Sequence, residues 1–563
     1  MNRALLVEAG LARPTRSNNG RWQVLVFAML LGGWAVAESG IFSGHVINLA
    51  GWPLLRAFFD AAARPDLSPD FLRLTLHASA ITFCYAVCGL ALSLILGFAG
   101  GVLSSEVWWT GTMRGSPWLA IRGLLAVPRS IHEVIWALFF VATIGLDSVS
   151  AILALGLPFG AITAKVFSEI LDESPRGAYH AFLNAGAAKG PAFLYGLLPH
   201  ALPNLLSYSF YRFECAIRSS AVLGVIGAGG LGYEILLSFQ SLRYAQIWTL
   251  LFALIALSGF TDLWSSRLRR WLDAPTRVSI LASRDAGGVH GLLHGSRPLR
   301  WLVAAAAAVT VLSFIYVQPD LSRLTRPQTF LRVAEIARRA VPPDLGASQV
   351  WLLLRLGGQT LAMSVLAIGI AGIGGIALSY AAASSWGRSQ VDELPAGLVE
   401  RQFRQVRIMV VRLVLLGCRA LPPSVWALLI LFVVFPGVLP GALAIALHNL
   451  GILGRLMGES AENLDPKPLA ALRAAGTPTP HIFLYGVLPA TLSQNISYVL
   501  YRWEVCARET VLVGLVGAGG LGRLVTEQLS SFDYSGVLSS LMAMFVLTLM
   551  VDLMSARARS VVR

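Results

Sequence analysis

The sequence predicts an all-α polytopic membrane protein built from two tandem, parallel repeats of about six transmembrane helices each. Three observations lead to this fold class: an apolar composition, uncharged stretches of membrane-spanning length, and an internal repeat. The chain of 563 residues is 56% hydrophobic and only 13% charged, and its mean hydropathy is +0.67. A soluble protein of this size would carry more charge.

Several stretches are long and apolar enough to cross a bilayer, which takes about 20 residues of helix. The clearest are Trp22 to Ala37, Ile81 to Gly101, Trp301 to Val317 and Val537 to Val551. In the first half we expect six helices, at 22–40, 72–101, 119–145, 150–170, 203–226 and 245–263. No clear small-residue cleavage site follows the first apolar run, so we expect an uncleaved span there.

The internal repeat appears when the chain is compared with itself at an offset of 290 residues. Gly186 to Gly232 matches Gly476 to Gly522 at 21 of 47 positions without a gap. An even number of spans gives both copies the same orientation, so they are expected to enclose a path at their interface. The expected divisions are a tail at 1–21, a transmembrane domain at 22–266, an Arg-rich linker at 267–300, a second transmembrane domain at 301–556 and a tail at 557–563.

The formal net charge of +14 is concentrated in the two tails and the linker. Basic residues beside membrane spans mark the cytoplasmic face, so we expect both termini in the cytoplasm and no nucleic-acid partner. The segment 320–344 disagrees with this rule, because it carries five arginines against three acids yet falls on the outer side.

No pattern of metal ligands or nucleophiles is evident. The five cysteines lie in or beside apolar segments without ligand-like spacing: Cys84, Cys88, Cys215, Cys418 and Cys506. They predict neither a disulfide framework nor a zinc site, and we expect no metal and no cofactor. A membrane-embedded enzyme is disfavoured because His132 and Glu133 lack a second histidine at H-E-x-x-H spacing, where Trp136 stands.

A polar break separates the fourth and fifth spans of each copy. Each break holds an alanine, a glycine and, thirteen residues after the glycine, the proline of a Leu-Pro pair: Ala181, Gly186, Leu198 and Pro199, then Ala471, Gly476, Leu488 and Pro489. This spacing resembles the cytoplasmic coupling loop of permease subunits of binding-protein-dependent ABC importers. The triplets that open the motif differ from that family, reading His-Ala-Phe from His180 and Ala-Ala-Leu from Ala470.

The resemblance implies a type I importer with the MetI-like permease fold, whose coupling loops dock on a separate ATPase. Proline would make the corner rigid and glycine would permit close approach. An ordinary helix-turn connection is the alternative. The chain has no G-x-x-x-x-G-K-[ST] sequence, so we expect a transport subunit that is not an enzyme, with ATP hydrolysis on another polypeptide.

A glycine-rich motif follows the fifth span of each copy, at Gly227, Gly229, Gly230 and Gly232 and at Gly517, Gly519, Gly520 and Gly522. It matches G-x-G-x-x-G, but a dinucleotide fingerprint would follow a soluble strand rather than an apolar helix of span length. We interpret it as a tight break at the outer mouth, where irregular backbone is allowed if it lines a cavity or is covered by protein.

The fifth spans also resemble PhnE-type phosphonate permeases, through F-L-Y-G-x-L-P and an Arg-containing stretch that runs into V-L-G-x-V-G-A-G-G-[IL]-G. This resemblance covers both halves from about the second span onward. It implies an importer of phosphonate or a related phosphorus oxyanion in a bacterial inner membrane, with two ATPase subunits and one extracytoplasmic binding protein. Permeases for methionine or quaternary amines, and a 12-helix secondary transporter, are the alternatives.

Ionisable residues inside the fifth spans are candidates for the translocation path: Arg212, Glu214 and Arg218, then Arg502, Glu504, Arg508 and Glu509. Such groups are expensive at membrane depth and usually face a bundle interior or a water-filled path. Spacing predicts that each Glu pairs with the Arg four residues on. The pairs either neutralise each other or line a partly cationic path. His132, Glu133 and Ser219 differ from their repeat equivalents, so substrate contact is expected to be asymmetric.

Overall fold

The computed structural model describes residues 18–43, 46–109, 116–271, 296–382 and 398–562. Within these ranges the chain is helical and forms no strand, apart from one isolated bridge between Ile47 and Val434. Six helices are long and apolar enough to cross a membrane, or up to nine if each of three bent pairs counts as one span. The predicted all-α membrane class is confirmed. The tail at 1–17 and the linker core at 272–295 lie outside the described residues.

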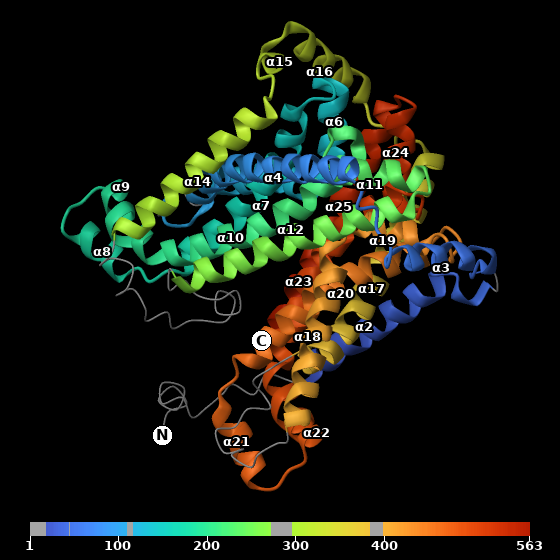
Figure 1. Ribbon diagram of the computed structural model, residues 1–563. Coiled ribbons are helices and arrows are strands. Elements are labelled where there is room, and N and C mark those ends of the chain that lie inside the picture. The colour runs from blue at the N-terminus through green and yellow to red at the C-terminus, as the bar shows by residue number, and fades with distance from the viewer. Residues whose placement is uncertain (1–17, 44–45, 110–115, 272–295, 383–397, 563) are drawn as a thin grey trace.

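The helices follow the same order in both halves (Figure 1). The first half holds α2 (Asn18–Glu38), α3 (Trp52–Ala61), α4 (Pro69–Ser104), α5 (Ser116–Ser130), α6 (Glu133–Ile144), α7 (Ser148–Glu173), α8 (Gly177–Asn184), α9 (Lys189–Ala192), α10 (Leu198–Leu223), α11 (Leu231–Gln240) and α12 (Tyr244–Trp271). The second half holds α14 (Ser296–Val317), α15 (Ser322–Thr325), α16 (Pro327–Ala340), α17 (Ala347–Ala382), α18 (Leu398–Ala420), α19 (Pro423–Ile430), α20 (Val438–Glu462), α21 (Pro466–Ala474), α22 (Thr479–Ile482), α23 (Leu488–Leu515), α24 (Gly520–Ser530) and α25 (Tyr534–Val562).

The prediction of one helix over 119–145 is wrong, because the structure has two helices there. Helices α5 and α6 meet at 86°, and their counterparts α18 and α19 meet at 95°. The bend in the first half is capped by His132, whose Nδ1 accepts the N–H of Val134 at 3.3 Å and so starts a new helix. In the second half Pro422 and Pro423 break the helix, because proline lacks a donor and restricts the residue before it.

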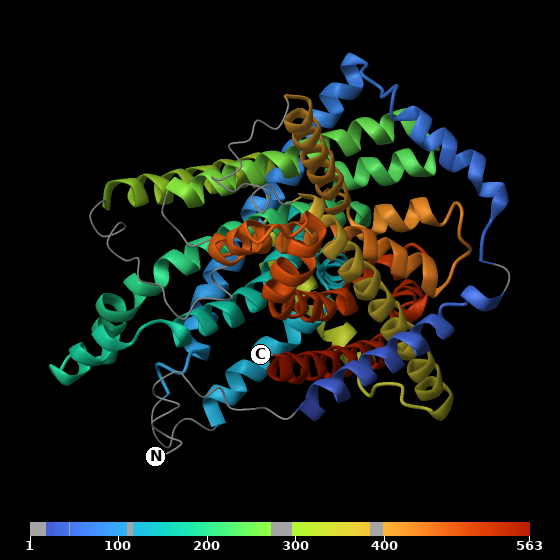
Figure 2. The same cartoon turned by 90° about the horizontal axis from the view of Figure 1, so that it is seen from below.

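The first helix of each half packs against the other half. Helix α2 lies along α17 and α25, and α14 lies along α4 (Figures 1 and 2). Ala35 of α2 is fully buried in the apolar core of the second half, and Tyr316 Oη of α14 lies 2.8 Å from His77 Nδ1 of α4. The two halves are therefore intertwined rather than merely adjacent.

The disputed segment 320–344 lies at the end of the molecule opposite the α8 and α21 regions (Figure 1). Its arginines are matched by acids: Arg323 Nε lies 3.5 Å from Asp147 and 3.2 Å from Asp320. Arg338 and Arg339 both pair with Glu335, and the Arg339 hydrogen bond lowers the pKa of Glu335. These pairs neutralise part of the positive charge of the segment, and the side of the membrane on which it lies stays a prediction.

The glycine motifs form the predicted tight breaks. Gly227, Gly229 and Gly230 have φ of +95°, +84° and +80°, a backbone conformation that favours glycine. Beyond the break, Leu231 N–H donates to Thr82 Oγ1 of α4 at 2.9 Å. In the second copy Leu521 N–H donates to Thr360 Oγ1 of α17 at 2.9 Å. Irregular backbone is thus hydrogen-bonded and covered by a long helix, as lipid requires.

Gly232 gives a direct test of this packing. A Cβ at this position would lie 1.7 Å from the carbonyl oxygen of Ala221, so Gly232→Ala must displace backbone, at about 1–3 kcal/mol. We expect a lower unfolding temperature for the purified chain in detergent. The matched control is Gly123→Ala, because Gly123 is helical and has no neighbour within 4 Å. Equal unfolding temperatures for the two variants would contradict this packing.

Candidate functional site

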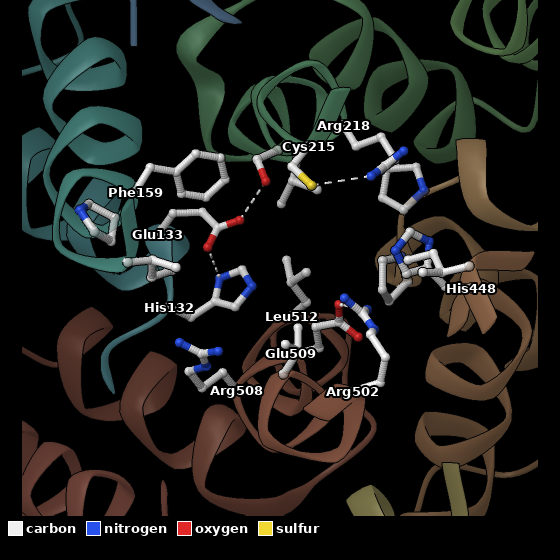
Figure 3. A pocket seen from close by; sticks show the side chains of 18 of the residues that line it. His132, Glu133, Phe159, Cys215, Arg218, His448, Arg502, Arg508, Glu509 and Leu512 are labelled. Atoms are coloured by element: carbon white, nitrogen blue, oxygen red, sulfur yellow. Dashed lines mark hydrogen bonds and ion pairs between the residues drawn. The ribbon is translucent and has the colours of Figure 1, made fainter. Parts of the chain in front are cut away.

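A cationic cavity lies where the two halves meet (Figure 3). Its volume is about 120 Å³, which is large enough to admit water. Helices α5, α6, α7 and α10 contribute from the first half, and α19, α20 and α23 from the second. Its charged and titratable lining is Arg129, Arg212, Arg218, Arg502, Arg508, Glu133, Glu509, His132, His448, Tyr211, Tyr501 and Cys215. Five arginines against two glutamates make the lining electropositive.

Five of the seven predicted path residues line this cavity, and Glu214 and Glu504 do not. The predicted pairing along the helix is wrong. Glu504 Oε1 accepts from Arg559 Nη1 of α25 at 2.6 Å. Arg508 Nη1 donates instead to the backbone carbonyl of Arg129 at 2.8 Å. Among the described residues neither predicted Glu–Arg ion pair forms. In the second copy both Glu504 and Arg508 have closer partners on other helices.

Arg218 and Cys215 face the cavity from α10 (Figure 3). Arg218 Nη2 donates to Cys215 Sγ at 3.4 Å. Across the described chain, neither Arg218 nor Arg508 forms an ion pair with a carboxylate. The cavity therefore presents positive charge that acids of the protein do not fully neutralise, a condition that favours an anion.

Arg502 has an acidic partner and a second acceptor within the protein. Its Nε donates to Asn449 Oδ1 at 2.7 Å and its Nη2 to Glu509 Oε1 at 3.0 Å. Asn449 Nδ2 closes the triad by donating to Glu509 Oε2 at 2.7 Å. This closed group holds no net charge.

The first-half residues at this place differ. Ser219 stands where the second copy has Glu509, and its hydroxyl donates to Glu133 Oε1 at 2.7 Å. His132 Nδ1 lies 3.4 Å from Glu133 Oε2. Figure 3 shows His132 and Glu133 across the cavity from Arg502 of α23. The asymmetry expected from the two copies is thus present in the lining.

Sequence reasoning missed His448, Asn449 and Phe159, which lie on α20 and α7. The signal was available: the 290-residue offset pairs Phe159 with Asn449, and an aromatic ring opposite an amide marks a place where the copies have diverged.

Reciprocal ion pairs between the halves were also missed. Arg129 Nη2 of α5 lies 3.7 Å from Asp552 of α25. Arg419 of α18 pairs with Asp262 of α12, which Arg455 Nη1 also approaches at 2.9 Å. The offset makes Arg129 equivalent to Arg419 and Asp262 equivalent to Asp552, so each half extends an arginine to the last long helix of the other.

A larger cavity of about 640 Å³ lies between α12, α18 and α20. Its charged side chains satisfy one another: Arg412 Nη2 lies 2.6 Å from Glu462, and Arg455 Nε lies 2.7 Å from Glu459. Because this lining is internally neutralised, it offers an anion less than the smaller cavity does.

The two predicted coupling regions, around α8 and around α21, lie apart from each other (Figure 1), and none of their residues lines the cavity. Gly186 and Gly476 have φ of +85° and +74° and end α8 and α21. Gly186 N–H donates to Leu183 O at 3.0 Å and Ala187 N–H to Phe182 O at 3.0 Å, the Schellman arrangement that terminates a helix. The glycine is therefore required by backbone geometry.

The Leu-Pro pairs do not end a helix. Each follows a π-helical turn, at Phe193–Leu197 and Phe483–Val487, and begins the long helix α10 or α23. Proline fits there because its missing N–H is not needed at the first turn. Leu194 and Tyr195 of the first turn, and Leu484 and Tyr485 of the second, are exposed.

Cys215 allows the cavity to be probed in the native chain. Of the five cysteines, the other four are buried, and Cys215 alone is part-exposed and lines the cavity. The positive charge of the cavity lining attracts an anionic reagent. We expect sulfonatoethyl methanethiosulfonate to add one group, on Cys215, and excess inorganic phosphate to slow the reaction. Intact mass measures this, with Cys215→Ser as the control. Equal labelling of that variant would contradict the accessibility of Cys215.

The fold is that of an integral membrane protein made of two repeated halves with a cationic cavity between them. The sequence pattern of the family described as "Binding-protein-dependent transport system inner membrane component" matches residues 108–278 and 394–559. The chain belongs to this family, the permease component of ABC importers, and carries its domain twice. The predicted class of permease is confirmed.

Named relatives carry the comparison further. The chain is 26% identical over 443 residues to the phosphate-import permease protein PhnE of Mycolicibacterium smegmatis, covering 78% of this chain and 77% of that protein. It is 30% identical over 227 residues to the phosphite transport system permease protein PtxC of Stutzerimonas stutzeri, covering 40% and 76%. An inward-facing structure of the MetNI methionine ABC transporter is similar with a TM-score of 0.33 and 21% identity, covering 36% of this chain and 99% of that chain.

Proposed function

We propose that this chain forms the membrane path of an importer for phosphonate or a related phosphorus oxyanion. The observation that supports this most is the cavity between the halves, with five arginines and two glutamates in its lining. An anion entering it loses hydration and gains charge-assisted hydrogen bonds, which contribute roughly 1.5–3 kcal/mol each. The relatives named for phosphate and phosphite import support the same class of substrate.

The cavity chemistry also ranks the alternatives. A quaternary amine is a cation, and the same arginines would repel it. Methionine carries a carboxylate and an ammonium group, and the arginines of the lining would repel the ammonium group. A doubly charged oxyanion fits the excess of positive charge better than either.

The substrate class is tested by uptake in cells that express the chain with its ATPase and its binding protein. We expect labelled phosphate or methylphosphonate to accumulate with ATP, and labelled methionine and choline to remain at the background of cells without the chain. Because the lining attracts anions, raising external phosphate should compete with methylphosphonate uptake. Methionine or choline accumulation, with no phosphorus oxyanion taken up, would sink the proposal.

We further propose that one chain associates with two ATPase subunits and one binding protein. Ala181 and Gly186 with Leu198 and Pro199, and Ala471 and Gly476 with Leu488 and Pro489, would belong to the two docking regions. Each such region presents an exposed tyrosine, Tyr195 at 71% and Tyr485 at 67% relative exposure. Exposed aromatic side chains are typical anchors at protein interfaces.

This arrangement places both termini in the cytoplasm and the glycine breaks at the outer mouth. Two observations support it. The α8 and α21 regions lie at the opposite end of the molecule from α16 (Figure 1). The first glycine break lies near the α16 end of the molecule. A Cβ built on Gly227 would lie 3.4 Å from Leu146, and the next residue, Asp147, pairs with Arg323 of the segment that leads into α16.

The docking proposal predicts stoichiometry. Native mass of the purified complex should give one permease chain with two ATPase subunits. Tyr195→Asp and Tyr485→Asp should each weaken one docking site, and the variant with both changes should lose the ATPase while keeping the same unfolding temperature. Phe330→Asp is the control, because Phe330 is 63% exposed on α16 at the far end. Two permease chains in one complex, or full ATPase binding by the double variant, would overturn the proposal.

A further inference from the structure

The two copies place the same arginine in the fifth helix but give it different surroundings. Arg212 of α10 and Arg502 of α23 are equivalent at the repeat offset, and both are buried, with 6% and 5% of their surface exposed. A buried guanidinium away from water needs acceptors for its five N–H groups or a neighbouring negative charge. How each arginine meets this requirement decides what it can bind.

Arg502 meets the requirement inside the protein. Glu509, seven residues further along the same helix, supplies the charge, and Asn449 of α20 supplies a second acceptor. The triad is closed by the bond between Asn449 and Glu509. An anion would have to displace Glu509 in order to reach this guanidinium, at the cost of leaving a buried carboxylate without its partner.

Arg212 has neither partner. Phe159 stands in place of the asparagine and Ser219 in place of the glutamate. The Arg212 guanidinium carbon lies 3.8 Å from the centroid of the Phe159 ring, so the ring covers one face of the charge. The edge remains available: Nε and Nη2 are buried and have no hydrogen-bond acceptor among the described residues.

The surroundings of Arg212 do not replace the missing carboxylate. Ser219 donates its hydroxyl to Glu133, so that neither group is committed to Arg212. Arg218 and Arg508, which line the same cavity, form no ion pair with an acid in the described part of the chain. The positive charge of the lining that no acid of the described chain pairs with therefore lies on Arg212 and Arg218 of α10 and on Arg508 of α23.

We propose that Arg212 is the oxyanion-binding group of the path, and that the site is one-sided because Glu509 and Asn449 neutralise Arg502. Its ligand class is a tetrahedral oxyanion of phosphorus with one or two negative charges, which accepts paired hydrogen bonds from the edge of a planar guanidinium. Phe159 holds that plane in place, and Arg218 and Arg508 add to the attractive field. This inference rests on the proposed function and specifies where the substrate is held.

The test is equilibrium binding of labelled inorganic phosphate to the full chain in lipid nanodiscs, together with uptake by the assembled importer. Arg212→Gln should lower phosphate affinity by about tenfold or more, the loss expected for charge-assisted hydrogen bonds, and should lower uptake in parallel. Its unfolding temperature should not fall, because a buried charge without a carboxylate partner has been removed.

Arg212→Lys covers the case in which the glutamine variant fails to fold. It keeps the charge but loses the planar pair of donors, so we expect folded protein with affinity between those of the parent and Arg212→Gln. The repeat supplies a comparison: Arg502→Gln with Glu509→Gln removes the equivalent arginine as a neutral pair, and should lower affinity less than Arg212→Gln alone. Arg523→Gln, on an exposed arginine that pairs with Glu527, controls for loss of any positive charge.

The outcomes separate this inference from the proposed function. A parent chain that neither binds phosphate nor takes up phosphorus oxyanions overturns both. A parent chain that transports them, while Arg212→Gln and Arg212→Lys keep parental affinity and uptake, overturns the role of Arg212 alone. A loss in the Arg502→Gln and Glu509→Gln variant equal to that in Arg212→Gln overturns the one-sided site.

Discussion

A guanidinium at membrane depth needs a neighbouring acid, carbonyl or aromatic ring, and the rest of this structure depends on which helix supplies that partner to each arginine. Water is absent from the hydrocarbon core, so an arginine there is tolerated only when acids, carbonyls or aromatic faces surround it. Arg559 reaches Glu504 from another helix, and Arg129 reaches Asp552 in the other half. The first of these pairs joins two helices of the second half, and the second joins the two halves.

The two copies share the same backbone features, whereas their side chains at equivalent positions of the cavity differ. Both copies keep the bent third span, the glycine break anchored by a threonine hydroxyl, and the π turn before the fifth helix. These features satisfy backbone groups, and every copy in a membrane needs them. The side chains that line the cavity satisfy no backbone groups, so they do not have to be the same in both copies. One half can therefore neutralise its arginine while the other leaves it able to bind.

Much of the fold could be predicted from the sequence, because the signals are local. Apolar runs fix the helices to within a few residues, and the glycines at positive φ mark the breaks. The bend in the third span was missed because the apolar runs before and after His132 together have the length of one span. The capping bond of His132 marks the bend in the first copy, and Pro422 and Pro423 were the sequence signal for it in the second. The pairing of Glu504 was predicted wrongly because spacing offers only neighbours on the same helix. Its partner, Arg559, lies 55 residues away.

The sequence by itself determined a lipid-embedded, duplicated, helical chain with charged fifth helices and two glycine and Leu-Pro loops, since hydrophobicity, repeat and turn chemistry are properties of short stretches. Only the tertiary structure decided that α2 packs on the second half and α14 on the first. It also decided that Arg129 and Arg419 each pair with an aspartate of the other half, and that Arg502 has a carboxylate partner whereas Arg212 has none among the described residues. The physical reason is that an ion pair is chosen by distance in space. Helices far apart in the chain bring these charges together only after the whole bundle has formed.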